Sequence, residues 1–279
     1  MDISAQNHKG KKVEYLESDD SSEIQILLIP GVMNTDIWKH QIKYFSRKYN
    51  FSTFKSGGET FQDDYRTIKS ILDQKEMKNT VLLSANLGNA IVQKVESHEN
   101  VVGSILSNTL NRQPREFSEN LYDIFWKSGF SHPKIVKNLF FSDKCKYINT
   151  KKFTGEIEKP GYERFRSYAN NYRLQKPEQD TLVINAGHDR FSSNEVARKL
   201  KPEAKISTIH NAGTFSYYEK PEEFNKAVDD FLRKIESFIQ SKKLRKTREK
   251  NRTLSEFSDS GNKRFHQKES EREQPVLRQ

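Results

Sequence analysis

Cysteine is almost absent from this chain, because Cys145 is the one cysteine among 279 residues. A single thiol cannot form an internal disulfide or a cysteine-cluster metal site, so we interpret Cys145 as a buried thiol without a redox role. The spacing of zinc-binding histidines, H-E-x-x-H, is also missing, and no glycine-rich loop has the lysine of a phosphate-binding motif. The sequence therefore predicts no metal and no cofactor.

Long hydrophobic runs are missing as well. A stretch such as "ILLI" (26–29) is far shorter than the roughly 20 apolar residues that cross a bilayer. The opening residues, "MDISAQNHKGKK", lack the apolar region of a signal peptide, and we expect residues 1–11 to be disordered. These absences predict a protein of the cytoplasm without a transmembrane segment.

Positive charge is abundant but uneven along the chain. Of the net charge of +10, residues 241–279 contribute 12 Lys and Arg against 6 Asp and Glu. This tail has few large apolar residues to offset the entropy of ordering, so we expect it to be mostly disordered. By charge alone it predicts an acidic partner, RNA or an anionic membrane surface, or else it is a solubilising tail that continues the last helix.

Six apolar, β-branched segments, each closed by a turn signal, are predicted to be strands: 25–31, 51–58, 80–86, 101–108, 181–187 and 205–213. Helical patterns lie between most of them. One covers 63–77, where Tyr65, Ile68 and Leu72 share a face, and the last begins at Pro221. This alternation is typical of an α/β fold with a mostly parallel central sheet covered by helices on both faces. We expect one such domain over residues 12–240.

The alternation has one long interruption, residues 111–176, which contains helical patterns only and is rich in Phe and Tyr. Ligands of open α/β sheets bind beyond the carboxyl ends of the strands, so a helical insertion after such a strand can cover a pocket. We interpret 111–176 as a helical cap whose aromatic residues mainly pack it onto the sheet.

Four stretches within 12–240 resemble, in the same order, motifs of the α/β-hydrolase superfamily. "LLIPGVMNTDIWKHQIKYF" is similar to a strand, an oxyanion loop and the following helix, with Pro30 where the family usually has His. "LLSANLGNAIV" is similar to the nucleophile elbow, with Asn86 at the nucleophile position. "TLVINAGHDRFSS" and "TIHNAGTFSYYEKPEEF" resemble the stretches that carry the acid and the histidine, which places Asp189 and Thr214 there. The resemblance implies an α/β-hydrolase fold with a degenerate triad.

The substitutions matter because acyl transfer on this fold needs a nucleophile, an imidazole base and an acid that holds the base. The amide of Asn86 is a poor nucleophile, and the hydroxyl of Thr214 is not a base near neutral pH. Asp189 then has no imidazole to orient, and we interpret it as a turn-forming residue or an ion-pair partner of Arg190. Two of the three catalytic roles are therefore missing.

The backbone turn at Asn86 can be retained despite these substitutions. Asn tolerates a positive φ better than most residues with a side chain, so Asn86 can keep the turn without the nucleophile. The backbone N–H groups of Leu87 and Val32 occupy the positions that the resemblance assigns to the oxyanion hole. A pocket that binds a small molecule with a carbonyl or carboxylate is therefore expected to remain.

The sequence favours a ligand-binding or protein-interaction module that is catalytically inactive as a serine hydrolase. The alternative is a hydrolase or lyase on a small ester or acyl substrate that uses Asp189, the backbone oxyanion hole and a displaced base. His210, four residues before Thr214, and His188, beside Asp189, are the candidate bases. A third hypothesis is an adaptor whose working part is the basic tail.

Overall fold

The computed structural model describes residues 2–8, 11–18, 22–55, 58–73, 77–110, 133–143, 153, 161–173, 179–200 and 202–270. It separates into two compact units, residues 1–233 and 234–279, close to the predicted domain end at 240. Cys145 and most of the predicted cap lie outside the described residues.

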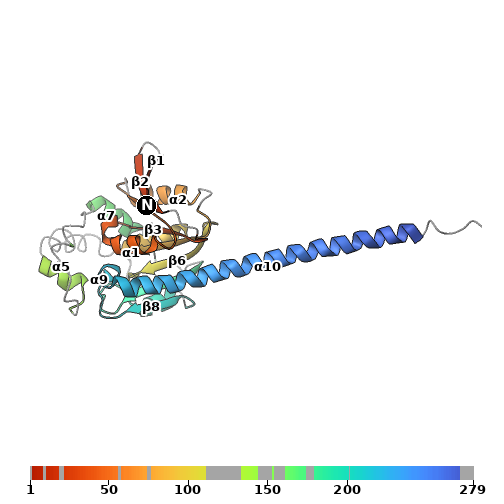
Figure 1. Ribbon diagram of the computed structural model, residues 1–279. Coiled ribbons are helices and arrows are strands. Elements are labelled where there is room, and N and C mark those ends of the chain that lie inside the picture. The colour runs from red at the N-terminus through yellow and green to blue at the C-terminus, as the bar shows by residue number, and fades with distance from the viewer. Residues whose placement is uncertain are drawn as a thin grey trace, which may run out of the picture. The chain divides into compact units, whose positions relative to one another are not determined.

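The first unit is built on one sheet of eight strands, in the order β1-β2-β4-β3-β5-β6-β7-β8 (Figure 1). Six strands from β4 to β8 in this order run parallel, as predicted, and β3 and β5 are buried along their whole length. Their bounds are β3 Gln25–Ile29, β4 Asn50–Lys55, β5 Thr80–Ala85, β6 Val101–Ser107, β7 Asp180–Ala186 and β8 Lys205–Ile209. The predicted fold class is confirmed.

Two strands at the edge of the sheet were not predicted. β1 (Asp2–His8) pairs antiparallel with β2 (Lys11–Ser18), and β2 pairs antiparallel with β4. The expectation that residues 1–11 are disordered is therefore wrong for 2–8. The physical reason is that an edge strand is held by backbone hydrogen bonds to its neighbour, which need no apolar pattern in the sequence.

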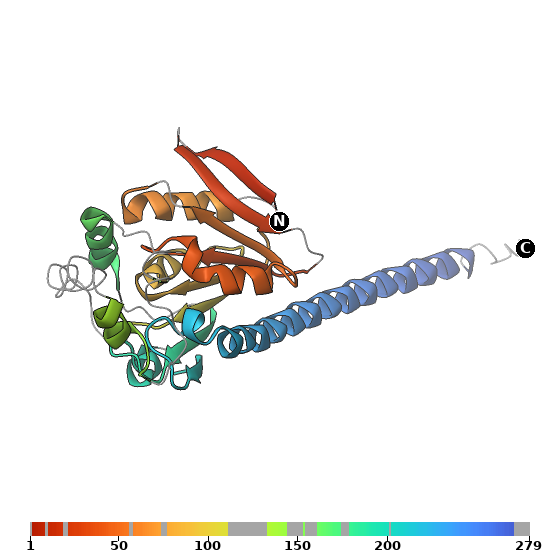
Figure 2. The ribbon, with the colours of Figure 1, turned by 60° about the vertical axis from the view of Figure 1, so that its left-hand side comes forward.

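Helices flank both faces of this sheet (Figure 2). Those that follow strands directly are η1 Thr35–Trp38, α1 Lys39–Phe45, α2 Phe61–Leu72, η2 Asn86–Gly88, α3 Asn89–Val95, α8 Asn194–Leu200 and α9 Ser216–Glu219. The predicted insertion between β6 and β7 contains α5 Pro133–Phe140 and α7 Tyr162–Asn171, so its described parts are helical. α2 begins with a capping box, in which Thr60 and Asp63 exchange hydrogen bonds between side chain and backbone.

The start of the last helix, α10 (Pro221–Ser270), is tied to α1 through buried polar contacts. The amide of Gln41 donates to the carbonyl of Tyr217 at 2.8 Å and to Asn225 Oδ1 at 3.1 Å. Trp38 stacks on Tyr217, with 4.0 Å between the ring centroids, and both rings are fully buried. These contacts join the helix after β3 to the segment after β8.

α10 continues to Ser270, so residues 241–270 have helical backbone where the sequence led us to expect disorder. The alternative of a tail that continues the last helix describes these residues better. Lys, Arg and Glu are good helix formers, and no proline interrupts the stretch between Pro221 and Ser270. In the described part of the chain, no helix is apolar over a length that could cross a membrane.

Candidate functional site

The turn after β5 has the backbone of a nucleophile elbow with an amide at its corner. Asn86 has φ +52°, so the positive φ that the sequence predicts there is present. The turn packs closely on the loop after β3, because a Cβ on Gly31 would lie 2.8 Å from Gly88 Cα. Asn86 Oδ1 is buried and accepts no hydrogen bond among the described residues. The corner thus presents an amide oxygen and no nucleophilic hydroxyl.

The nearest serine does not replace the nucleophile. Ser84 is fully buried, and its hydroxyl donates to Asn89 Oδ1 at 2.5 Å. The Asn89 amide in turn donates to the carbonyl of Ser107 at 3.0 Å. This chain of hydrogen bonds links β5, α3 and β6 behind the turn, so Ser84 has a structural role.

Asp189 and Thr214, predicted at the acid and histidine positions, are brought together. Thr214 Oγ1 donates to Asp189 Oδ1 at 2.7 Å, which is the contact that an imidazole N–H would make with the acid of a triad. Asp189 also accepts from the Phe191 N–H at 3.0 Å and from the Ser192 hydroxyl at 2.6 Å. The carboxylate is thus held by neutral donors, and these contacts take the place of the ion pair with Arg190 that the sequence suggested.

Asn108, directly after β6, is a site residue that sequence reasoning missed. It has φ +51°, it is fully buried, and its amide donates to Asp189 Oδ2 at 2.8 Å. Its Oδ1 accepts from Ser107 and from Ser216. One amide therefore joins the carboxyl end of β6 to the loops after β7 and β8. The only signal in the sequence was an Asn at the end of a strand, which is also common in plain turns.

Neither candidate base replaces the missing histidine in this arrangement. The side chains of His188 and His210 are both exposed. Neither ring is among the partners of Asp189, whose hydrogen-bond donors are Asn108, Phe191, Ser192 and Thr214. General base catalysis needs a base within hydrogen-bond reach of the proton that it removes. The displaced-base mechanism gains no support from this geometry.

The cap closes over Thr214 through α5. A Cβ on Gly213 would lie 2.2 Å from the carbonyl oxygen of Phe140, so the two backbones are in direct contact. The buried carboxylate of Glu219 accepts from the N–H of Gly213 at 2.7 Å and from that of Ser142 at 3.1 Å. The Glu219 side chain therefore connects the segment that carries Thr214 to the end of α5 through hydrogen bonds. Thr214 itself is 5% exposed.

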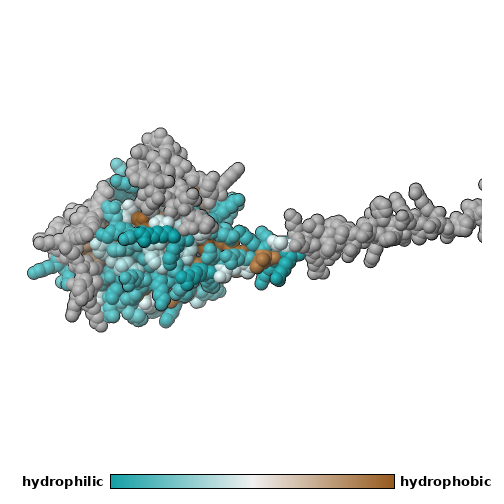
Figure 3. All heavy atoms as spheres, viewed as in Figure 1, coloured by the Kyte–Doolittle hydropathy of each residue, from teal (hydrophilic) through white to brown (hydrophobic). Residues whose placement is uncertain are grey.

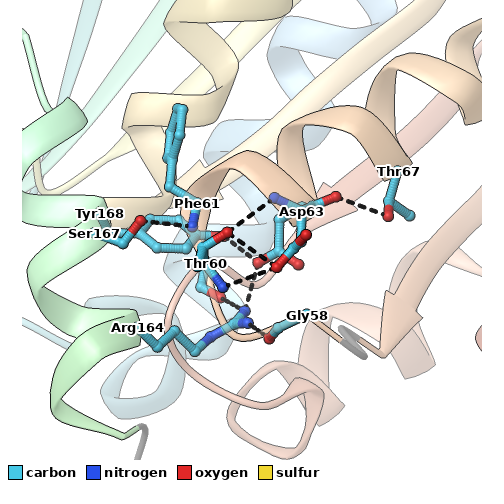
Figure 4. Close-up of polar contacts among 10 residues, drawn as sticks. Gly58, Thr60, Phe61, Asp63, Thr67, Arg164, Ser167 and Tyr168 are labelled. Atoms are coloured by element: carbon cyan, nitrogen blue, oxygen red, sulfur yellow. Dashed lines mark hydrogen bonds and ion pairs between the residues drawn. The ribbon is translucent and has the colours of Figure 1, made fainter. Parts of the chain in front are cut away.

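A second cap helix, α7, holds the loop that contains Val32. Arg164 donates through Nη2 to the carbonyl of Gly31 at 2.9 Å. Through Nη1 it donates to the carbonyl of Gly58 (Figure 4). In a trans peptide the C=O and the next N–H point in opposite directions. Arg164 therefore sets the direction of the Val32 N–H, the group predicted at one of the oxyanion-hole positions.

Arg164 belongs to a buried polar cluster that joins α7 to α2. Its Nη2 lies 2.6 Å from Asp64 Oδ2, and the same oxygen accepts from the Tyr168 hydroxyl at 2.5 Å. Burial, followed by the charge of Asp64, holds the pKa of the Tyr168 phenol well above its ordinary value, so the phenol keeps its proton and donates. Ser167 adds a third contact between the two helices by accepting from the Phe61 N–H at 2.9 Å.

A pocket of about 690 Å³ opens on the Arg164 side of this loop, at the carboxyl ends of β3 and β4. The described residues around it do not include the predicted triad positions Asn86, Asp189 and Thr214, and of the two predicted oxyanion-hole positions they include Val32 but not Leu87. It is lined by Pro30, Val32, Met33, Asn34, Thr35, Asp36, Phe54, Lys55, Gly58, Glu59, Gly161, Tyr162, Glu163 and Arg164. Where side chains are described, no three His, Cys, Asp or Glu residues are grouped as metal ligands would be.

The Asp189–Thr214 contact can be tested through stability. Replacing Thr214 by Val, which has nearly the same shape, is expected to lower the free energy of unfolding by about 1.5 kcal/mol, because a hydrogen bond to a carboxylate is lost. Thr67→Val is the matched control. The Thr67 hydroxyl only donates to Asp63 O within α2, so its loss should change stability by less than roughly 0.5 kcal/mol. Urea unfolding measures the stability of both variants. Equal losses in Thr214→Val and Thr67→Val would contradict a stabilising hydrogen bond between Thr214 and Asp189.

No protein-family model and no curated protein matches the chain. Solved structures do match it. A thermophilic esterase from Thermogutta terrifontis, with malate bound, is 15% identical with a TM-score of 0.69, over 85% of this chain and 100% of the esterase. An enol-lactonase from Burkholderia xenovorans is 14% identical with a TM-score of 0.66, over 82% and 99%. An alpha/beta hydrolase fold protein from Chitinophaga pinensis is 15% identical with a TM-score of 0.68, over 82% and 96%.

Proposed function

We propose, from the premise that this chain has the α/β-hydrolase fold, that it is a non-hydrolytic member of that fold and acts as a ligand-binding or protein-interaction module. One observation supports the proposal: Thr214, predicted at the histidine position, donates a hydrogen bond from its hydroxyl to Asp189. A hydroxyl that is used in this way cannot remove a proton from a nucleophile. With an amide at position 86 there is also no nucleophile from which to remove one.

The pocket on the Arg164 side of the oxyanion loop is the proposed place for a small-molecule ligand. Parallel sheets of this kind bind ligands beyond the carboxyl ends of their strands, and this pocket lies at the ends of β3 and β4. Its lining carries three carboxylates (Asp36, Glu59 and Glu163), whereas the charge of Arg164 is compensated by Asp64. Like charges repel a carboxylate ligand, so of the two groups expected from the sequence we favour a neutral carbonyl, and Lys55 is the other cation among the described lining residues.

The wild-type protein is expected to release no product from short-chain esters and lactones, measured by mass spectrometry of the reaction mixture. A ligand that binds the folded state should nevertheless raise the thermal midpoint, by the equivalent of about 2.7 kcal/mol at a concentration of 100 times its Kd. Stabilisation without product supports the proposal. Product formation that is lost when Asp189 is changed to Asn would contradict it and favour the displaced-base enzyme.

A single nucleophile is not expected to restore activity. Asn86→Ser supplies a hydroxyl at the corner, but the predicted histidine position carries Thr214, and of the described histidines the two candidate bases, His188 and His210, are exposed and make no contact with Asp189. The variant should therefore show no burst of acylation with an activated ester. Asn86→Ala serves as the matched control for the change at the corner. A burst in the serine variant alone would show that another base is within reach.

A further inference from the structure

The helix α10 carries a dense group of positive charges in the second unit. The eleven residues from Lys242 to Arg252 contain seven cationic side chains (Lys242, Lys243, Arg245, Lys246, Arg248, Lys250 and Arg252) and one carboxylate, Glu249. We call this stretch the basic segment. All of its side chains that the structure describes, 242–249, are exposed. With a rise of 1.5 Å per residue, the basic segment spans about 16 Å.

The charges of the basic segment cover more than half of the helix circumference. Successive residues of an α-helix are rotated by about 100°. Counted from Lys242, Lys243 therefore lies roughly 100° round the helix, Arg248 roughly 240° and Arg245 roughly 300°. A solvated face of an ordinary surface helix would keep its charges on one side, opposite an apolar stripe. The cations of the basic segment instead spread over roughly 220°, and the remaining arc of about 140° carries Leu244 with the polar Thr247 and Asn251, which is not an apolar stripe.

An anionic membrane is a poor match for this distribution. Helices that lie in a membrane interface need a continuous apolar face. The large exposed apolar side chains near the basic segment are Phe238, 50% exposed, and Leu244, 61% exposed. They lie about 120° apart round the helix and so form no stripe. The described surface seen in Figure 3 is likewise mainly hydrophilic, with small, separate hydrophobic patches.

Double-stranded DNA matches the basic segment in both shape and charge. An α-helix with its side chains is about 10–12 Å wide, and the major groove of B-DNA is about 12 Å wide, with phosphates along both walls. A helix whose cations cover roughly 220° of its circumference can approach both walls at once. The major groove of A-form RNA is too narrow for this. DNA carries one negative charge per roughly 1.7 Å of its axis, so a segment of this length faces several phosphates.

We infer that the basic segment of α10, residues 242–252, binds the phosphate backbone of double-stranded DNA, independently of its base sequence. The inference does not depend on the function proposed for the first unit. Binding of this type is driven by the release of counterions from the phosphates. It should therefore weaken steeply with salt, with a slope of log K against log salt of about −6 if all seven cations take part.

The test uses the full chain and a labelled DNA duplex of about two helical turns, roughly 21 base pairs, in a fluorescence anisotropy titration. Changing Lys242, Arg245, Lys246 and Arg248 to Gln keeps the helix propensity and removes four charges. At about 50 mM salt this variant should bind more than ~10-fold more weakly, and its salt slope should be flatter by about 3 to 4 units. Its thermal midpoint should equal that of the wild type.

A matched control removes the same number of lysines and arginines from the first unit. Lys43, Arg47, Arg198 and Lys226 are exposed, and changing them to Gln should alter DNA affinity by less than roughly 2-fold. An equal loss in both variants would overturn the inference, since the binding would then follow net charge alone. Wild-type binding to duplex RNA or to phosphatidylserine vesicles as tight as to DNA would also overturn it, and so would no binding to DNA at low salt.

Discussion

Replacing Asp64 by Ala is expected to lower the free energy of unfolding by about 3 kcal/mol, because it removes the carboxylate that compensates the charge of the Arg164 guanidinium, whose side chain is only 13% exposed. Asp64 is 1% exposed, and it accepts from both the Arg164 guanidinium and the Tyr168 hydroxyl. Burial of an unpaired charge is one of the most costly changes that a single substitution can make. Urea unfolding of the variant beside the wild type measures the loss.

The matched control for Asp64→Ala removes both charges together. In the double variant Asp64→Leu/Arg164→Met neither charge is left, and replacing a buried ion pair by apolar residues of similar size is often close to neutral. The double variant should therefore recover more than half of the stability lost in Asp64→Ala. Loss of the Tyr168 hydroxyl alone, in Tyr168→Phe, should cost only about 1 kcal/mol. If the double variant were less stable than Asp64→Ala, the lost attraction between the two charges would explain the loss of stability better than the uncompensated charge does.

Replacing Gly31 by Ala is expected to destabilise the first unit by about 3 kcal/mol, from strain and from a steric clash. Gly31 has φ +70°, a region that residues with a side chain rarely adopt. The new methyl group would lie 2.8 Å from Gly88 Cα and 2.9 Å from Gly88 N, so the backbones of the oxyanion loop and the elbow would have to separate. Thermal unfolding and urea unfolding both measure the effect.

Gly187 offers the matched control for Gly31→Ala. It is an exposed glycine after β7, and a Cβ there would make only ordinary contacts, the nearest at 3.6 Å. Gly187→Ala should therefore change stability by less than about 1 kcal/mol. If both alanine variants were equally stable, the close approach of Gly31 and Gly88 would not be a constraint on the fold, and the loop that carries Val32 would be free to move away from the elbow.

The parallel strands and the corner at Asn86 could be predicted because their signals are local. Each strand is a short apolar segment with a turn after it, and the positive φ at Asn86 follows from a motif of five residues. The strand β1 could not be predicted in this way, since its pairing partner β2 supplies the hydrogen bonds that hold it. The helical backbone of 241–270 agrees with the alternative of a tail that continues the last helix, because Lys, Arg and Glu favour a helix even in a segment with few apolar residues.

The site could be predicted only as a set of positions. Sequence motifs placed Asp189 and Thr214 in matching stretches, but the hydrogen bond between them joins residues that are 25 positions apart. Arg164 and Asp64 are 100 positions apart, and neither lies in a motif. Asn108 likewise gains its partners only when the ends of β6, β7 and β8 meet at one edge of the sheet.

The sequence by itself determined the order of the six parallel strands with the helices between them, and the residue types at positions 86, 189 and 214, because residue type and short-range periodicity decide these properties. Only the tertiary structure decided that Thr214 donates to Asp189, that Arg164 from the cap orients the Gly31–Val32 peptide, and that the described lining of the pocket includes Val32 but none of the predicted triad positions. These are contacts between segments far apart in the chain. Their energies depend on distance and burial, which exist only once the chain has folded.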